Sequence, residues 1–298
     1  MALVGGHINR YHAKGKRPNI LAHIKVAQQE AEDEAKFPLG VVSIFVGGPK
    51  NREITLNEDE RIELREFIEE TGLQVIAHSS YSANSWSKGD PDAAHFIREE
   101  LEVCQEAGIR GLVVHLPKAP ISQTMKYIAR LFNPNAPDVR VYLETPAVNP
   151  KETYYETPAK LAALFTAIRE QFDPDLEYFG LCVDSAHIWT CGVDVSDYAS
   201  ADAWLSELEK FADTIPHEVV MIHLNDSARA LGVGPDTHAP LLRGKIWESY
   251  RDSPEKSGLA AFTDYAQRHD APIILERKPK EMLTSDYLIL RKLIPPAE

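Results

Sequence analysis

The sequence has no long hydrophobic run and very little cysteine. Hydrophobic residues make up 44% of its 298 residues, but no run approaches the roughly 20 consecutive apolar residues that cross a bilayer. At the amino end the apolar residues come first and the charges after, which is the reverse of a signal peptide. The three cysteines (Cys104, Cys182 and Cys191) form neither a disulfide framework nor a cysteine-based zinc site. We therefore expect a soluble, cytoplasmic protein without a membrane partner.

Positive charge is also scarce. The chain has 32 Lys and Arg residues against 45 Asp and Glu residues, a formal net charge of −13. Because phosphate contacts favour basic surfaces, this total argues at first against a nucleic-acid partner. Bound metal ions would add local positive charge, and a total does not say where the basic residues lie. A nucleic-acid partner is therefore not excluded.

Short apolar, β-branched runs recur along the chain and predict parallel strands. Near-continuous hydrophobic strands of this kind are buried on both faces, as in parallel sheets. The eight runs span residues 2–8, 40–48, 73–80, 109–116, 139–146, 178–186, 218–226 and 271–278.

The stretches between the runs have apolar residues at helical spacing, with start and stop signals at their ends. Asn57 and Asp90 are expected helix caps, and Gly72 and Gly108 are expected helix ends. The helical patterns cover residues 57–72, 90–108, 157–172, 200–215 and 257–269. Strands alternating with helices predict an α/β fold, a single (β/α)₈ TIM barrel spanning residues 1–298.

Polar residues follow the predicted strands, at the end of a parallel barrel where chemistry gathers. Each has an ordinary structural explanation when taken alone. Asp184 in "VDSAH" (183–187), for example, is a good helix cap. Several carboxylates on one rim would repel one another unless something positive held them, so their convergence predicts a metal centre. The nine candidate ligands are His78, His115, Glu144, Asp184, His187, His223, Asp236, His238 and Glu276.

The types of donor atom limit which metals the site can bind and which reactions it can catalyse. Imidazole nitrogens and carboxylate oxygens without thiolates suit zinc or manganese. Nine ligands exceed the needs of one tetrahedral ion and, with one shared carboxylate, suffice for three. Clustered metal ions are typical of enzymes that cleave phosphate esters.

At these positions the sequence resembles the endonuclease IV family of apurinic/apyrimidinic (AP) endonucleases, over nearly the whole chain. The segments that carry the resemblance are "AHSSY" (77–81), "LVVHL" (112–116), "YLETP" (142–146), "GLCVDSAH" (180–187), "HLNDS" (223–227), "DTH" (236–238) and "ILE" (274–276). The segments "FVGGPKNRE" (45–53) and "AHIWTCGV" (186–193) look closer to the form carried by large cytoplasmic DNA viruses. For a viral protein, the host cytoplasm or the virion is the expected location.

The resemblance implies three zinc ions, with manganese as an alternative at one site. One ion would take His78, His115 and Glu144. A second would share Glu144 and add Asp184, His223 and Glu276, and the third would take His187, Asp236 and His238. Family members cut the phosphodiester 5′ of an abasic site in base excision repair, leaving a 3′-hydroxyl and a 5′-deoxyribose phosphate, and they trim blocked 3′ ends. Glu144 would bridge two ions, and Glu276 would help to orient or deprotonate the attacking water.

The expected partner is then double-stranded DNA, bound by a monomer. An enzyme that acts on a sugar phosphate within a duplex must expel the nucleotide and fill the gap. Tyr81 matches the family position that stacks into the emptied site, and Lys50, Asn51 and Arg52 follow the second strand. A basic rim on an acidic body is expected, and its members include Lys16, Arg17, Arg229, Arg243 and Arg277. Replacing Lys16 and Arg17 with Ala should lower DNA affinity and flatten its salt dependence.

Two other functions remain open at this stage. A sugar isomerase or epimerase on the same barrel would also gather Glu, Asp and His at strand ends, but it typically holds one or two ions. The presumptive third ion site, with His187, Asp236 and His238, favours phosphoester cleavage instead. A catalytically silent DNA-binding protein would be expected to have lost a ligand, and none is lost.

Overall fold

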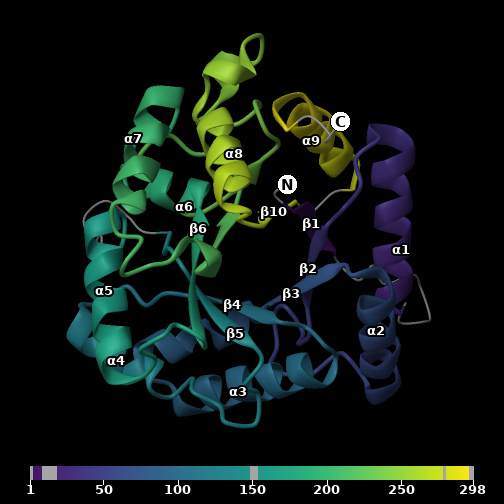
Figure 1. Ribbon diagram of the computed structural model, residues 1–298, viewed down its shortest axis with the longest axis vertical. Helices are drawn as coiled ribbons and strands as arrows, with labels where there is room; N and C mark the ends of the chain where they lie inside the picture. Colours follow the sequence, from purple (N-terminus) through teal and green to yellow (C-terminus); the bar gives the residue numbers. More distant parts are fainter. Residues whose placement is uncertain (1–2, 9–18, 148–153, 278–279, 295–298) are drawn as a thin grey trace.

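Eight parallel strands close into a barrel in the computed structural model (Figure 1), which describes residues 3–8, 19–147, 154–277 and 280–294. The strands are β1 (Val4–Ile8), β2 (Val41–Phe45), β3 (Gln74–His78), β4 (Gly111–His115), β5 (Arg140–Glu144), β6 (Phe179–Asp184), β7 (Val220–His223) and β10 (Ile273–Leu275). Neighbours around the barrel follow the order β1-β10-β7-β6-β5-β4-β3-β2. All eight predicted strands are present, and the predicted (β/α)₈ barrel is confirmed.

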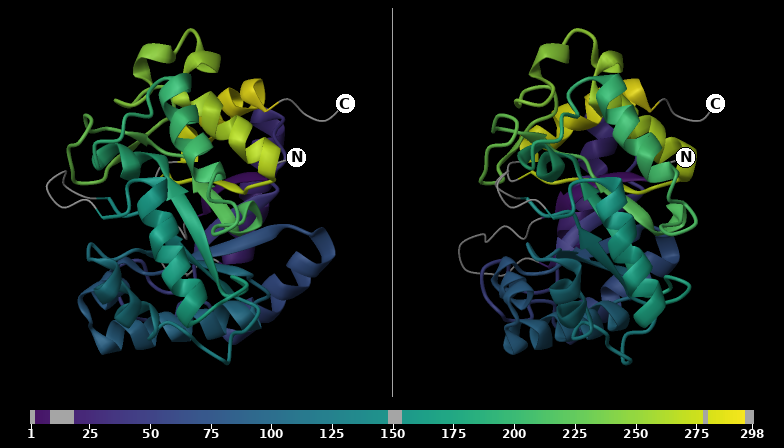
Figure 2. Two further views of the ribbon diagram at one scale, coloured as in Figure 1. Left: turned by 60° about the vertical axis from the view of Figure 1, so that its left-hand side comes forward. Right: turned by 90° about the vertical axis from the view of Figure 1, so that its left-hand side faces the viewer.

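Helices surround the barrel on its outer side (Figures 1 and 2). They are α1 (Ile20–Glu30), α2 (Glu58–Thr71), α3 (Pro91–Glu106), α4 (Ile121–Ile128), α5 (Pro158–Gln171), α6 (Ser185–Thr190), α7 (Tyr198–Glu209), α8 (Gly258–His269) and α9 (Lys280–Leu293). Shorter helical turns are η1 (Ala31–Ala35), η2 (Tyr81–Lys88), η3 (His217–Val219), η4 (Glu248–Tyr250) and η5 (Pro254–Lys256). Beyond β7, β8 (Asp226–Ser227) pairs antiparallel with β9 (His238–Ala239).

The predicted helix signals act as expected. Asn57 caps α2 through a reciprocal capping box with Glu60, and Gly72 ends the helix with a φ of 69°. That backbone conformation is accessible to glycine at little cost. Asp90 caps α3 by accepting from the backbone N–H groups of Asp92 and Ala93. The helices that surround the barrel are therefore set locally by the sequence.

The barrel interior has two layers of inward-facing side chains. The lower layer is buried and mostly apolar: Val41, Ile76, Val113, Tyr142, Cys182, Met221 and Ile274. Side chains alternate in direction along a strand, so the next inward position lies two residues further on. Six of the predicted ligands occupy those positions: His78, His115, Glu144, Asp184, His223 and Glu276. The carboxyl end of the barrel therefore carries the polar layer.

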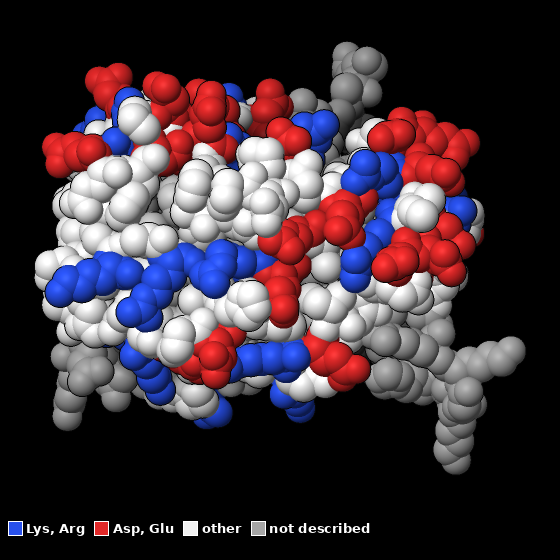
Figure 3. Space-filling view, turned by 90° about the horizontal axis from the view of Figure 1, so that it is seen from below, with Lys and Arg blue, Asp and Glu red and all other residues white. Residues whose placement is uncertain are grey.

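One outer face carries charged side chains of both signs, which are partly intermixed (Figure 3). Acidic side chains gather along its upper margin and at its right-hand end, and Lys and Arg side chains form a row over its left half. α2, at the lower right of Figure 1, has three acidic residues in its first turn and lies toward the right-hand end of this face. In the described part of the chain, no helix has the length and hydropathy needed to cross a membrane.

Candidate metal centre

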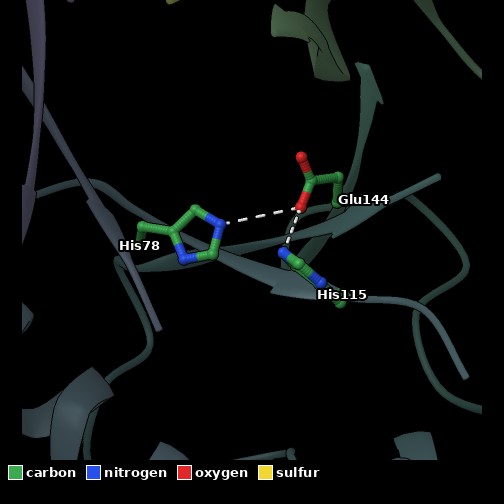
Figure 4. A group of neighbouring side chains, drawn as sticks. All are labelled: His78, His115 and Glu144. Atoms are coloured by element: carbon green, nitrogen blue, oxygen red, sulfur yellow. Dashed lines mark ion pairs between the residues drawn. The ribbon is translucent and has the colours of Figure 1, made fainter. Parts of the chain in front are cut away.

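Three side chains from adjacent strands β3, β4 and β5 form the first group (Figure 4). One Glu144 oxygen, Oε2, lies 2.9 Å from His115 Nε2 and 3.6 Å from His78 Nε2. Parallel pairing brings these strand ends together, because His115 stands directly opposite Glu144 in the register. His78, His115 and Glu144 each offer a ligand atom within 4.8 Å of the others.

The second Glu144 oxygen faces a different group. Glu144 Oε1 accepts a hydrogen bond from His223 Nδ1 at 2.7 Å. The same His223 nitrogen lies 3.5 Å from Glu276 Oε2 and 4.0 Å from Asp184 Oδ2. Ligand atoms of these four residues also lie within 4.8 Å of one another. Glu144 is therefore shared between two groups, one through each carboxylate oxygen.

The loop after β7 contributes the remaining candidates. Asp236 Oδ2 lies 3.5 Å from His187 Nε2 and 3.1 Å from His238 Nε2. His238 reaches the rim because it lies on β9, where it pairs with Ser227 of β8. Asp184 also belongs to this region, since its Oδ2 lies 3.8 Å from His238 Nε2. All nine predicted ligands thus meet at the carboxyl end of the barrel.

Asp184 both caps a helix and joins the cluster. Its Oδ1 accepts the backbone N–H of His187 at 2.9 Å and so caps α6. Its Oδ2 points the other way, toward His223 and His238. A cap needs only one oxygen, so the capping role of Asp184 leaves Oδ2 available as a candidate metal ligand.

Two histidines are oriented for binding through Nε2. His78 Nδ1 lies 2.8 Å from the backbone oxygen of Ser79, and His187 Nδ1 lies 2.6 Å from that of Thr145. A carbonyl only accepts, so each Nδ1 carries a proton, and Nε2 is the nitrogen that would bind a metal ion in the neutral ring. This arrangement is typical of metal-binding histidines.

Several buried polar atoms of the cluster make no hydrogen bond within the described part of the chain. His223 Nε2 and Asp236 Oδ1 have no hydrogen-bond partner there, and Glu144 Oε2 and His238 Nε2 have only the close contacts with His115 and Asp236 given above, which lack hydrogen-bond geometry. Leaving such atoms unsatisfied costs free energy unless a ligand completes their coordination. The donor set therefore fits metal ions.

The electrostatics of the cluster also require cations. Burial would raise the pKa of Glu144, but His115, His223 and His187 hold it well below its usual range. Burial likewise opposes ionisation of Glu276, yet His223 and His78 lower its pKa to about 2. The carboxylates in turn raise the pKa of His187 well above the usual value, although burial lowers it. The buried negative charge is thus balanced by the histidines in this structure, and a bound metal ion would balance it in their place.

The candidate DNA-contact residues differ in exposure and in the contacts that they make with the rest of the protein. Tyr81 is 49% exposed, and its ring centroid lies 5.6 Å from that of His78 and 6.2 Å from that of His115. Lys50 and Asn51 are exposed at the loop after β2. Arg52 is held in place, because its guanidinium donates to Ser85 Oγ, the Ser82 carbonyl and Asp90.

Among the basic residues, Arg229 and Arg243 are exposed, near the loop after β7. Arg277 does not belong to the expected basic rim. It is 5% exposed and paired with the buried carboxylate of Asp286. Lys16 and Arg17 lie outside the described residues.

Sequence reasoning missed the residues that hold the ligands. Asn225 is fully buried and donates to Asp184 Oδ2 at 2.6 Å and to Glu276 Oε2 at 3.2 Å. Its position inside "HLNDS", two residues after His223, was the available signal. His7, in contrast, is expected near the site from its position at the end of the first strand, and it is buried beside the cluster with Nδ1 3.1 Å from Ser43 Oγ. Burial lowers its pKa to about 3.

Comparison with known proteins defines the class. A family model described as a xylose isomerase-like TIM barrel matches residues 34–276, and the chain belongs to this family. The probable AP endonuclease of African swine fever virus (isolate Warthog/Namibia/Wart80/1980) is 38% identical over 269 residues, which are 88% of this chain and 89% of that protein.

Two solved structures agree. A crystal structure described as AsfvAP:AG superposes with a TM-score of 0.89 at 34% identity, covering 98% of this chain and 99% of that one. Endonuclease IV from Thermus thermophilus gives a TM-score of 0.71 at 24% identity, with 98% of each chain covered, and supports the fold alone. The resemblance to AP endonucleases of the endonuclease IV type, and to their viral form, is confirmed.

Proposed function

We propose that this protein is a zinc-dependent DNA repair endonuclease that hydrolyses the phosphodiester 5′ of abasic sites in duplex DNA. The products would be a 3′-hydroxyl and a 5′-deoxyribose phosphate. The observation that carries the proposal is the convergence of nine His, Asp and Glu side chains on one barrel rim, with Glu144 shared between two groups. The name of the viral relative, a probable AP endonuclease, supports the same substrate.

The ligand groups suggest three ions. His78, His115 and Glu144 would hold the first, and Glu144, Asp184, His223 and Glu276 the second. His187, Asp236 and His238 would hold the third, with Asp184 beside it. When bound, zinc would lower the pKa of water and neutralise charge on the phosphate oxygens. Manganese at one of the sites is the alternative, because imidazole and carboxylate ligands suit both metals.

Two glutamates would have distinct roles. Glu144 faces its neighbours with both oxygens, which is the geometry of a bridging carboxylate. Glu276 lies at the rim with Oε2 3.5 Å from His223 Nδ1, and a carboxylate in that position would orient or deprotonate the attacking water.

The rim offers a surface for a DNA duplex. Tyr81 would stack where the nucleotide leaves, directly above His78 and His115. Lys50, Arg229 and Arg243 would contact phosphates, and Arg52 would act mainly by fixing the loop that carries its neighbours. The same centre would remove blocked 3′ ends, because the bond attacked is again a phosphoester. A monomer acting in the cytoplasm suffices for these steps.

The test is incision of a duplex with a single abasic site by protein of assayed zinc content. His187→Ala serves as the matched variant, because it removes a ligand of the third group only. We expect cleavage 5′ of the lesion by the unchanged protein and loss of cleavage in the variant. Absence of cleavage by fully zinc-loaded protein would overturn the proposal and favour a sugar isomerase or epimerase.

A further inference from the structure

Three buried polar side chains lie in a row behind the candidate ligands, and only the first of them, Asn225, contacts the ligands directly. Asn225 follows β7, Arg277 follows β10, and Asp286 lies on α9. Their exposed fractions are 0%, 5% and 0%. Burial of an amide, a guanidinium and a carboxylate in one row is costly unless each is paired. Asp286 of α9 pairs with Arg277, and Arg277 donates to Asn225, which contacts the candidate ligands of the second ion.

The side chain of Asn225 uses both ends of its amide. Its Nδ2 donates to Asp184 Oδ2 at 2.6 Å and to Glu276 Oε2 at 3.2 Å. Its Oδ1 accepts from the backbone N–H of Glu276 and from Arg277 Nη1, both at 3.0 Å. A guanidinium can only donate, so Arg277 requires the amide oxygen on its side. The amide nitrogen must therefore face the two carboxylates.

The backbone of Asn225 is fixed to the end of β6. Its N–H donates to Ser185 Oγ at 2.9 Å, and the same hydroxyl donates to the Asn225 carbonyl at 2.8 Å. Ser185 is the neighbour of Asp184 in the chain. The distance between the amide of Asn225 and the carboxylate of Asp184 is thus set by the backbone as well as by the side chains.

Arg277 is held in turn by Asp286. The guanidinium Nε lies 2.9 Å from Asp286 Oδ2, and Nη1 donates to the Glu276 carbonyl at 2.8 Å. The other oxygen, Asp286 Oδ1, accepts the backbone N–H of Leu241 at 2.8 Å. Leu241 ends the segment that carries Asp236 and His238. One carboxylate on α9 therefore anchors two parts of the rim.

A contribution to folding stability does not by itself explain why Asn225, Arg277 and Asp286 are buried together. A buried ion pair is often no more stabilising than apolar side chains of similar volume. The pair does, however, determine which way the amide of Asn225 points. Because two carboxylates on one ion repel until it binds, a donor that touches both holds their spacing in advance.

We propose that Asn225, oriented by the Arg277–Asp286 pair, is a positioning residue that sets the spacing of Asp184 and Glu276 for the second metal ion. The proposal rests on the proposed function, because it takes these carboxylates as metal ligands. Residues that orient metal ligands in this way typically change metal affinity by about 10- to 100-fold when replaced. The effect should concern one ion of the three.

The experiment compares Asn225→Asp with the unchanged protein. Aspartate has the same shape but cannot donate to Asp184 and Glu276 when ionised. We expect the affinity for one equivalent of zinc, measured by competition with a chromophoric chelator, to fall about 10- to 100-fold. The visible spectrum of the cobalt-substituted protein should change as well, which a purely structural role would not cause. Unchanged zinc affinity together with an unchanged cobalt spectrum would overturn the proposal.

Asn133→Asp is the matched control. Asn133 is also buried, and its amide donates to the Arg98 carbonyl and to Glu102, outside the ligand cluster. This variant should lower the melting temperature of the metal-free protein without changing zinc affinity. An equal loss of zinc affinity in both variants would overturn the proposal, because any buried asparagine would then have the same effect.

A second variant keeps the inference testable if Asn225→Asp does not fold. Arg277→Met frees the amide to rotate, so we expect a loss of zinc affinity in the same direction. Where Asn225→Asp folds, the double variant should lose no more affinity than Asn225→Asp alone, because the arginine acts through the asparagine. Full zinc affinity in Arg277→Met would contradict the role of the pair. Failure of the unchanged protein to bind zinc at all would instead overturn the proposed function.

Discussion

The two inward-facing layers of the barrel lie on the same strands and differ completely in chemistry. On β7, Met221 belongs to the apolar layer, and His223, two residues later, belongs to the polar one. The same step separates Tyr142 from Glu144 on β5. The lower layer is packed, whereas the upper layer leaves buried polar atoms without hydrogen bonds in the described part of the chain. The apolar layer thus contributes packing to the core, and the polar layer, nearer the carboxyl ends of the strands, contributes the candidate ligands.

The largest expected effect comes from breaking the upper layer at its centre. Glu144→Gln keeps the shape but removes the charge that His115 and His223 surround. We expect incision to fall by about 10³-fold, because metal ions contribute several kcal/mol to such reactions. Zinc content should fall by at least one ion per molecule in elemental analysis. Tyr142→Phe on the same strand is the control, and it should retain its zinc.

A substitution in the lower, apolar layer should reduce stability and leave zinc binding unchanged. Met221→Ala removes a fully buried side chain, and the free energy of unfolding should fall by about 2–5 kcal/mol. Urea unfolding of the metal-free protein measures this change. Zinc bound per folded molecule should not change, since Met221 contacts the core and offers no ligand. A loss of zinc at full folding would show that the layers are not independent.

A pH experiment separates the carboxylates of the cluster from a buried carboxylate outside it. Burial raises the pKa of Glu100 to about 7, against 4.5 for an ordinary glutamate, although Ser79 and Ser80 donate to it. The folded protein therefore binds a proton more tightly than the unfolded chain does. The free energy of unfolding should fall as pH rises from about 4.5 to 7, by at most about 3 kcal/mol.

Glu100→Gln should flatten this dependence. Urea unfolding of metal-free protein at pH 5 and pH 8 makes the comparison, because bound metal would add a pH dependence of its own. Part of the slope should persist, since burial also raises the pKa of Asp226 and Asp286 to about 6. An unchanged slope in the variant would show that Glu100 is not the source.

The smallest effect is expected at the exposed edge of the polar layer. Tyr81→Ala should weaken binding of abasic-site DNA by about 1–3 kcal/mol, the range for stacking of a base on an aromatic ring. Binding is measured by fluorescence anisotropy with catalysis blocked by Glu144→Gln. Tyr81→Phe keeps the ring and should bind normally, because the surface on which a base would stack is unchanged. Equal binding by the alanine variant would remove Tyr81 from the DNA interface.

The barrel and the six candidate ligands at strand ends could be predicted because both depend on local patterns. A strand of period two followed by a polar residue places that residue at the rim, whatever the rest of the chain does. Glu144 and His223 are 79 positions apart in the sequence, yet each was found from its own strand.

The surroundings of the ligands could not be predicted, because they depend on contacts between distant elements. Arg277 was assigned to the DNA-binding rim from its position after β10, but Asp286 of α9 holds it in the interior. Arg52 was expected to be free for DNA and instead pairs with Asp90 at the start of α3. α7 begins at Tyr198 and not at Ser200, because Asp197 caps it by accepting the N–H of Ser200.

The segment that carries Asp236 and His238 is fastened at both ends by protein contacts alone. Pairing of β8 with β9 closes it, and the N–H of Leu241 is bonded to Asp286. The entropy of closing the segment is therefore lost during folding and not during metal uptake. An ion at the proposed third site would therefore bind to a segment that is already folded, and its loss would not require the segment to unfold.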